Sequence, residues 1–285
     1  MKSGFAVMIG RSNVGKSTLL NSLVGTKVAI TTPKPQTTRK PVQGVLTTDE
    51  GQVVFVDTPG VMQKARDPLT KKLLQWVEDS LRDIEVILYV VDPTRPIGNE
   101  EKKAMQLIAG VQKPKLLVIN KIDEKSSNRN IAFYRDLFNN DTFDAMVEVS
   151  AIRGTNLDLI KRWIFENLPE GELMYPESDI SNMRKEEQIA ELIREKLFLR
   201  LRQEVPYSTH VEVEEIDQRK NGVVYIKAVI YTTDERYKSM IIGKEGRGIS
   251  EIGRATRNEL EAVTQQKFYL DLNVQVDSRW LDRLV

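Results

Sequence analysis

The sequence predicts an α/β domain followed by a smaller α+β domain, and three observations lead to this fold class. Over residues 1–168, short runs that are apolar throughout alternate with amphipathic segments, which is typical of a mostly parallel sheet with helices on both faces. Residues 169–183 are rich in proline, glycine and acidic side chains, which indicates a linker or strap. Residues 184–285 then show helix and strand patterns in a different order.

Apolar runs of strand length occur in the first domain at 5–9, 53–56, 86–91, 115–119 and 146–149. Helical patterns lie between them, around 15–24, 68–83, 99–112, 128–139 and 155–168. One more strand pattern, at 42–48, is separated from the next run only by "DEG" at 49–51. Because so short a connection permits only an antiparallel hairpin, we expect one antiparallel edge strand in this sheet.

The second domain begins with a long helical pattern at 184–205. Its apolar residues fall on or near one face: Ile189, Leu192, Ile193, Leu197, Leu199 and Leu201. Strand patterns at 210–218 and 223–233 are joined through Asn221-Gly222, a hairpin signal. A helix, a loop at 243–246, a helix to about 263 and a strand at 267–276 follow, so the predicted order is α-β-β-α-α-β.

The composition excludes several classes of protein. The chain has 285 residues, a formal net charge of +1 and no cysteine, which removes disulfides, thiolate metal sites and cysteine nucleophiles. A nearly neutral chain attracts polyanions only through a local patch. The N-terminus does not read as a signal peptide, and no apolar run is long enough to span a membrane. We expect a cytoplasmic monomer with no DNA partner, and peripheral contact with the inner face of the cell membrane stays open.

The stretch "GRSNVGKST" at 10–18 matches G-x-x-x-x-G-K-[ST] directly after the first apolar run. Its glycines let successive backbone N–H groups point at an anionic phosphate, and the helix that follows adds its positive dipole end. Lys16 is expected to bridge two phosphates and the Ser17 hydroxyl to bind Mg²⁺. The predicted nucleotide-binding residues of this loop are Gly10, Arg11, Ser12, Asn13, Val14, Gly15, Lys16, Ser17 and Thr18.

A second motif, "VDTPG" at 56–60, ends an apolar strand. Asp57 is placed to hold the Mg²⁺ shell through a water, and the N–H of Gly60 can meet a γ-phosphate. Thr58 and Pro59 lie between these two residues and are predicted to border the nucleotide as well.

Two further motifs favour guanine over adenine. In "NKID" at 120–123, Asp123 can accept hydrogen bonds from guanine N1–H and the 2-amino group. Adenine offers neither donor, so a buried, unpaired carboxylate would penalise ATP. Asn120 and the Lys121 stem can contact the other edge and the ring face. Ser150 and Ala151 begin "SAIRG" at 150–154, where the Ala151 N–H can reach guanine O6.

The four motifs, each at the carboxyl end of a predicted strand, resemble those of the translation-factor-related class of GTPases. The run "PKPQTTRKPVQGVL" at 33–46 is similar to the Era branch of that class. The resemblance implies Mg²⁺-dependent conversion of GTP to GDP and phosphate. It also implies a switch-loop threonine in the Mg²⁺ shell, by position Thr38, with Thr37 as the alternative. The implied catalytic residues are Lys16, Thr38 and Gly60, and the implied Mg²⁺ ligands are Ser17, Thr38 and Asp57.

The position after the D-x-x-G motif is Val61, where many GTPases carry a glutamine that orients water. An apolar side chain cannot do so, and we therefore predict slow intrinsic turnover. Related GTPases with an apolar residue here often bind K⁺ through an asparagine of the P-loop, and Asn13 stands at that place. The alternative is an asparagine that only caps the loop. No arginine finger is assignable, although Arg39 and Arg66 lie in neighbouring loops.

The C-terminal domain carries the loop "GKEG" at 243–246 between two predicted helices, and its element order resembles a type II KH domain. In such domains the glycines let an RNA backbone approach exposed N–H donors. Residues 236–257 carry a local charge excess of +4. The predicted RNA-binding residues are Ile242, Gly243, Lys244, Glu245, Gly246, Arg247, Arg254 and Arg257.

Four isoleucines near this loop, Ile241, Ile242, Ile249 and Ile252, are predicted to line a groove for bases. The alternative is that several of them belong to the core, since they recur at helical spacing. The single histidine, His210, is expected to be a solvated strand residue and not a ligand.

A GTPase domain, a strap and a type II KH domain in this order resemble the Era family nearly end to end. The resemblance implies binding to small-subunit, 16S-type ribosomal RNA near its 3′ end and a role in 30S subunit assembly. A constitutive RNA-binding module with a GTPase docking domain remains an alternative, and an ATP-using P-loop enzyme is a weaker one. The sequence leaves open the RNA bases bound, the trigger of hydrolysis and the coupling between the domains.

Overall fold

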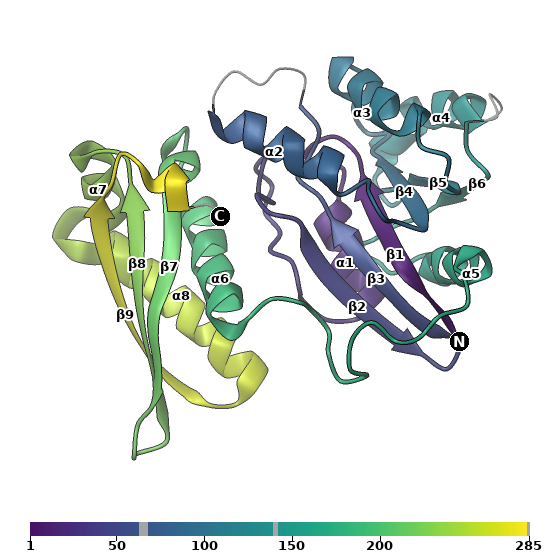
Figure 1. Cartoon of the computed structure of the whole chain (residues 1–285). Helices are drawn as coiled ribbons and strands as arrows, with labels where there is room; N and C mark the ends of the chain where they lie inside the picture. Colours follow the sequence, from purple (N-terminus) through teal and green to yellow (C-terminus); the bar gives the residue numbers. More distant parts are fainter. Residues whose placement is uncertain (63–67, 139–141, 284–285) are drawn as a thin grey trace. The chain divides into compact units, whose positions relative to one another are not determined.

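The computed structural model describes residues 1–62, 68–138 and 142–283. The chain divides into two compact units, Met1–Asn182 and Met183–Val285 (Figure 1). None of the helices in the described ranges is long and apolar enough to cross a lipid bilayer.

The first unit is built on a six-stranded sheet in the order β2-β3-β1-β4-β5-β6. The strands are β1 (Lys2–Ile9), β2 (Val42–Thr48), β3 (Gly51–Asp57), β4 (Val86–Val91), β5 (Lys115–Ile119) and β6 (Ala145–Glu148). Only β2 runs antiparallel to its neighbour, because a tight hairpin joins it to β3. The parallel sheet with one antiparallel edge strand is therefore confirmed.

Helices lie on both faces of this sheet: α1 (Lys16–Val24), α2 (Pro68–Asp79), α3 (Asn99–Ala109), α4 (Ile131–Phe138) and α5 (Leu157–Asn167). Helices α2, α3 and α4 share one hydrophobic core with β1 and β4, whereas α1 and α5 contact the sheet elsewhere. A strand covered on both faces can be apolar throughout, and β4 is buried at all 6 of its residues. The helical pattern around 128–139 begins with a 3₁₀ helix, Lys125–Arg129, and its last residue lies outside the described ranges.

The strap, residues 169–182, runs back along the edge of this sheet. The Val45 N–H donates to the Ile180 carbonyl at 3.0 Å, and Gly171 donates to the Met1 carbonyl at 2.8 Å. The fully buried Gln52 side chain accepts from the Met174 and Tyr175 N–H groups at 2.8 and 2.9 Å. The strap thus satisfies the free edge of β2 and is part of the first unit.

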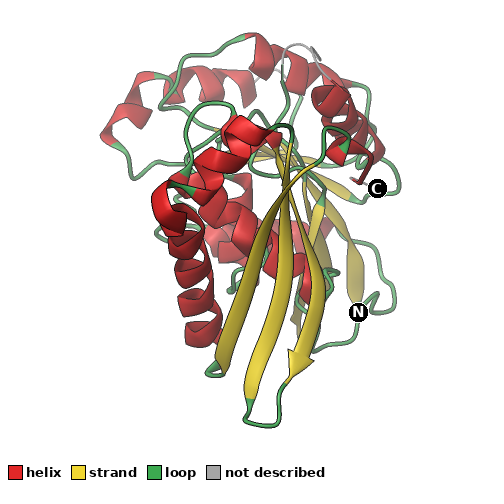
Figure 2. Cartoon of the chain, turned by 90° about the vertical axis from the view of Figure 1, so that its left-hand side faces the viewer, coloured by secondary structure: helices red, strands yellow, loops and turns green. Residues whose placement is uncertain are grey.

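The second unit contains α6 (Lys185–Arg200), β7 (Thr209–Gln218), β8 (Val223–Thr232), α7 (Glu235–Ile242), α8 (Arg247–Thr264) and β9 (Lys267–Val276). Its sheet has the order β7-β8-β9, in which β7 and β8 are antiparallel and β8 and β9 parallel (Figure 2). Ile193 and Leu197 of α6 share a core with Ile226 and Ile230 of β8. The predicted order α-β-β-α-α-β is confirmed.

Three details of the second unit differ from the prediction. Helix α6 ends at Arg200, not near 205, because Leu201 has an extended backbone (φ −80, ψ 159) and Gln203 has φ 54; a separate 3₁₀ turn, Val205–Ser208, follows. Leu199 does not join the apolar face and is 53% exposed. His210 is not solvated: its side chain is 15% exposed, lies 3.4 Å from Glu212 and stacks on the buried Trp280.

Candidate functional site

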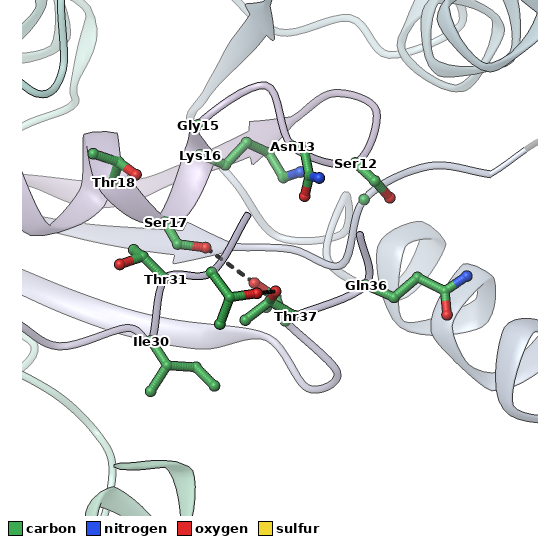
Figure 3. Close-up of a pocket in the computed structure, with 13 residues that line it drawn as sticks. Ser12, Asn13, Gly15, Lys16, Ser17, Thr18, Ile30, Thr31, Gln36 and Thr37 are labelled. Atoms are coloured by element: carbon green, nitrogen blue, oxygen red, sulfur yellow. Dashed lines mark hydrogen bonds between the residues drawn. The ribbon is translucent and has the colours of Figure 1, made fainter. Parts of the chain in front are cut away.

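The four predicted motifs follow β1, β3, β5 and β6 at the carboxyl edge of the sheet. A cavity of about 410 Å³, including the open space at its mouth, lies at the first two of them (Figure 3). It is lined by Ser12, Asn13, Gly15, Lys16, Ser17, Thr18, Ile30, Thr31, Thr32, Gln36, Thr37, Thr38 and Gly60.

Two close approaches explain why glycine is needed in the P-loop and the D-x-x-G loop. Gly15 has φ +98, and a Cβ there would meet the Asn120 amide nitrogen at 2.4 Å. A Cβ on Gly60 would lie 2.4–2.6 Å from the Oγ, Cα and N atoms of Ser12. The Val61 N–H donates to the Gly10 carbonyl at 3.1 Å, so the two loops are fastened together by their backbones.

Lys16 curls back over its own loop. Its ammonium group donates to the carbonyls of Gly10 and Arg11 at 3.2 and 3.4 Å, and the residue is 6% exposed. Burial lowers the pKa of Lys16, while the nearby carboxylates of Asp57 and Glu101 partly oppose this. No carboxylate of the described residues forms an ion pair with Lys16, and such a cation at the start of a helix is suited to bind a phosphate.

Ser17, Thr38 and Asp57 meet beside this lysine. The Ser17 and Thr38 hydroxyls donate to Asp57 Oδ2 at 2.6 and 3.1 Å, and the two hydroxyl oxygens lie 3.0 Å apart. Asp57 Oδ1 is buried and has no hydrogen-bond partner among the described residues. Burial raises the pKa of Asp57, against the effects of Lys16 and the two hydroxyls.

This oxygen cluster fits a magnesium ion. Mg²⁺ prefers oxygen ligands and usually binds through one or two carboxylates, waters and substrate phosphates. The partnerless Asp57 Oδ1 and two hydroxyls supply such a set, although the described residues contain no group of three or more acidic, histidine or cysteine side chains suited to a metal. Thr37 does not take part, because its hydroxyl lies 2.6 Å from the Thr32 hydroxyl and donates to the Lys34 carbonyl.

Asn120 and Lys121 tie the motif loops to one another. The Asn120 amide donates to the Val14 carbonyl at 2.9 Å and accepts from the Ala151 N–H at 3.0 Å. The Lys121 ammonium donates to the Asn13 carbonyl at 3.0 Å and pairs with the buried Asp92 at 2.7 Å.

Asp123 is less enclosed than the sequence analysis assumed. Its side chain is 16% exposed, accepts from the Ser150 hydroxyl at 2.6 Å and lies 3.9 Å from Arg153. Asp123 is also not among the cavity-lining residues, because the cavity takes in the phosphate side of the site. A carboxylate at the surface can still accept the two donors of a guanine edge, which would itself bury it.

The candidate RNA-binding loop of the second unit has the backbone that its glycines allow. Gly243 and Gly246 have φ of 72 and 74, and Glu245 between them has φ 55. A Cβ on Gly243 would meet the Gly248 nitrogen at 2.9 Å. Lys244 and Arg254 are exposed, so charged side chains surround an accessible stretch of backbone.

Comparisons with known proteins match both units to described families. Residues 5–121 match the family described as 50S ribosome-binding GTPase, and residues 204–281 match the KH domain. The GTPase Era of Halothermothrix orenii is 44% identical over 283 residues, covering 99% of this chain and 95% of the relative. That of Carboxydothermus hydrogenoformans is 43% identical with the same coverage. The chain belongs to the Era family of GTPases.

Solved Era structures have the same fold over nearly the whole chain. An Aquifex aeolicus Era variant bound to GDP and AlF4⁻ is 37% identical with a TM-score of 0.92, covering 99% of this chain and 96% of its own. An Era complex with MgGDPNP and nucleotides 1506–1542 of 16S ribosomal RNA is 36% identical with a TM-score of 0.93 and the same coverage.

Three of the residues predicted from the P-loop and D-x-x-G motifs turn their side chains away from the cavity of this Era protein. The Arg11 guanidinium pairs with the buried Glu101 at 3.1 Å. Val14 belongs to the core, and the buried Thr58 hydroxyl donates to the Met8 carbonyl at 2.7 Å. These residues can meet a nucleotide only through their backbone.

The sequence analysis missed cavity-lining residues of the loop between α1 and β2, among them Thr31, Thr32 and Gln36. The run at 33–46, which resembles the Era branch, already marked part of this loop, but only its threonines were predicted as site residues. Arg39 is buried in the same region, and Arg66 lies outside the described residues.

The isoleucine groove predicted in the KH domain is partly wrong. Ile241 and Ile252 are 0% and 1% exposed and belong to the core, because they face the sheet. Ile242 and Ile249 are only partly buried and remain accessible beside the loop.

Proposed function

We propose that this protein binds and hydrolyses GTP, and that the bound nucleotide controls a KH domain that binds small-subunit ribosomal RNA during 30S assembly. The proposal that the protein binds GTP rests on one observation: three oxygen-bearing side chains, Ser17, Thr38 and Asp57, meet beside Lys16. The RNA part is supported by Era-family membership, since an Era protein has been solved with 16S ribosomal RNA.

The residues act mainly by positioning and by charge neutralisation. Ser17, Thr38 and Asp57 would hold Mg²⁺, which supplies positive charge to the β- and γ-phosphate oxygens when bound. Lys16 exchanges the carbonyls of its own loop for phosphate oxygens, and the Gly60 N–H donates to the γ-phosphate. The fully buried Val61 cannot orient the attacking water, and we therefore expect slow turnover.

Guanine selectivity is assigned to Asp123, supported by Asn120, Lys121, Ser150 and Ala151. Isothermal titration with GTP, GDP and ATP tests this assignment. Binding of both guanine nucleotides and no measurable ATP binding is expected, because adenine leaves the carboxylate without donors. Equal affinity for ATP and GTP would contradict the assignment and favour an ATP-using enzyme.

A potassium ion is proposed to stimulate hydrolysis through Asn13. Its amide nitrogen donates to the Pro33 carbonyl at 2.8 Å, so the side chain already links the P-loop to the loop that bears Thr38. Faster turnover in K⁺ than in Na⁺ at equal ionic strength supports the proposal. Equal rates in the two salts would leave Asn13 as a loop cap only.

RNA capture is assigned to the loop at 243–246 and the basic residues that follow. Lys244→Ala and Arg247→Ala should weaken binding to a 16S 3′-end oligonucleotide and leave GDP affinity unchanged, since cationic contacts to phosphates set such affinities. Lys220→Ala, at the exposed hairpin tip of the same unit, is the matched control. Weakening by the control to the same degree would show only nonspecific charge attraction.

Control by the nucleotide is tested by comparing RNA affinity in GDP and in a non-hydrolysable GTP analogue. Different affinities indicate coupling of the two units, whereas equal affinities indicate a constitutive RNA-binding module. Peripheral membrane contact stays a prediction, which sedimentation with anionic lipid vesicles would test.

A further inference from the structure

A buried polar cluster lies next to the phosphate loop, outside the cavity-lining residues. The Arg11 Nε lies 3.1 Å from Glu101 Oε2, and these two side chains are 4% and 2% exposed. The contact is ionic only, because this Nε has no hydrogen-bond partner among the described residues. Both carboxylate oxygens of Glu101 also accept hydroxyl groups from the core, one from Tyr89 and one from Tyr134 at 3.3 Å. Glu101 sits in the first turn of α3, far along the chain from the loop that it contacts.

Stability does not explain this ion pair. Burying two charges costs more than their attraction returns in many proteins, and apolar residues of similar volume often serve as well. Burial raises the pKa of Glu101 even though Arg11 and both tyrosines oppose the shift. The charged carboxylate is therefore retained at a cost to folding, which points to a functional reason.

The guanidinium of Arg11 fixes the backbone of the phosphate loop. It donates to the carbonyls of Pro96 and Asp92 at 2.8 and 3.2 Å, on the loop that follows β4. A second hydrogen bond joins the same two loops: the Arg95 guanidinium, on the loop after β4, donates to the Ser12 carbonyl of the phosphate loop at 3.0 Å. The backbone of Arg11 also pairs with Val61 and offers its carbonyl to Lys16.

We infer that Glu101 is a positioning residue that acts through Arg11. By holding the guanidinium in one orientation, it sets the path of the backbone from Gly10 to Gly15, whose N–H groups are aimed at phosphates. This role rests on the proposed binding of GTP and GDP. It also explains why Arg11, predicted as a nucleotide contact, points away from the cavity.

The test is a double-mutant cycle on GDP release, measured by displacement of a fluorescent GDP analogue from Glu101→Gln, Arg11→Met and the combined variant. Each single variant should release GDP about tenfold faster, the effect of losing roughly 1.4 kcal/mol of positioning. The combined variant should release it little faster than Arg11→Met, because Arg11 is the loop residue that Glu101 contacts directly and its effect on Lys16 is electrostatic and indirect.

Thermal unfolding of the nucleotide-free proteins distinguishes positioning from folding. Glu101→Gln leaves the buried Arg11 charge without its partner and should lower the unfolding temperature, whereas the combined variant removes both charges and should unfold near the wild-type temperature while it still releases GDP faster. Glu100→Gln removes the same charge from the same helical turn and should change neither property. Fast release in Glu101→Gln together with wild-type release in the combined variant would overturn the inference, because release would then follow folding stability, and additive effects of the two substitutions would overturn it as well.

The outcomes also separate this inference from the proposed function. A wild-type protein that does not bind GDP would refute both. GDP binding with the same release rate in every variant would refute only the positioning role of Glu101.

Discussion

Replacing Gly60 with alanine would force two loops of the nucleotide site apart. The added Cβ would lie 2.4–2.6 Å from three atoms of Ser12, two of which are backbone atoms that no change of rotamer can move. Ordinary contact begins near 3.4 Å, so the loops must separate by nearly 1 Å. Gly60 has no positive φ, and the cost is therefore steric and not conformational.

The size of the effect follows from this displacement. Overpacking of this kind costs about 1–3 kcal/mol, which lowers the unfolding temperature of a domain this size by roughly 3–10 °C. A shift of about 1 Å in a positioning group costs roughly 100-fold in rate. GDP lacks the γ-phosphate that Gly60 is proposed to contact, so GDP affinity should fall much less than the rate of hydrolysis.

Single-turnover GTP hydrolysis, GDP titration and thermal unfolding measure these three effects. Gly110→Ala is the matched control, since nothing lies within 4 Å of its added Cβ and its φ is −84. A lowered unfolding temperature with unchanged hydrolysis would refute the γ-phosphate contact. Unchanged values of both would refute the clash itself.

Three further predictions concern other parts of the chain. Asp123→Ala should weaken GDP binding at least 100-fold in isothermal titration, because two donors of the guanine edge lose their acceptor. Gln52→Leu should lower the free energy of unfolding by about 1–3 kcal/mol in denaturant titration, because it removes a buried side chain that accepts from two N–H groups of the strap. In nucleotide-free protein, the free energy of unfolding should fall as pH rises through the raised pKa of Glu101. The reason is that the folded state binds this proton more tightly than the unfolded state does, and loses that advantage when the carboxyl group ionises. Glu101→Gln should lack this component, so the difference in unfolding free energy between this variant and the wild type should move in favour of the variant as pH rises.

Their controls and contrary outcomes are specific. Gln75→Leu removes an exposed glutamine that donates to Asp79 of its own helix and should barely change stability. Unfolding free energies equal to the wild type in Gln52→Leu would mean that the strap is not held by this side chain. If the unfolding free energy depends on pH in the same way in the wild type and in Glu101→Gln, the raised pKa of the buried Glu101 carboxyl is refuted. Unchanged GDP binding in Asp123→Ala would refute the contact between Asp123 and guanine.

Local rules account for what could be predicted from the sequence. The order and direction of the strands follow from apolar runs, helical spacing and the tight hairpin between β2 and β3, each of which depends on neighbouring residues. The need for glycine at positions 15 and 60 could also be predicted, because each lies in a short sequence motif that marks where two backbone segments approach closely.

Side-chain directions could not be predicted in this way, because distant contacts decide them. Arg11 turns toward Glu101, 90 positions away, and the sequence pattern placed it with the nucleotide instead. Thr38 and Thr37 are adjacent and chemically alike, and only the loop path brings the first to Ser17 and Asp57. Leu199 fits the apolar pattern of α6 but lies at the surface near the end of that helix.

By itself, the sequence determined two domains, four loop motifs at one edge of a sheet and a glycine loop between two helices. Those features depend on backbone constraints and periodicity within a few residues. The tertiary structure decided which side chains converge, where the strap lies and which isoleucines are core. Such choices depend on packing between segments far apart in the chain, where burial and hydrogen bonding outweigh local preference.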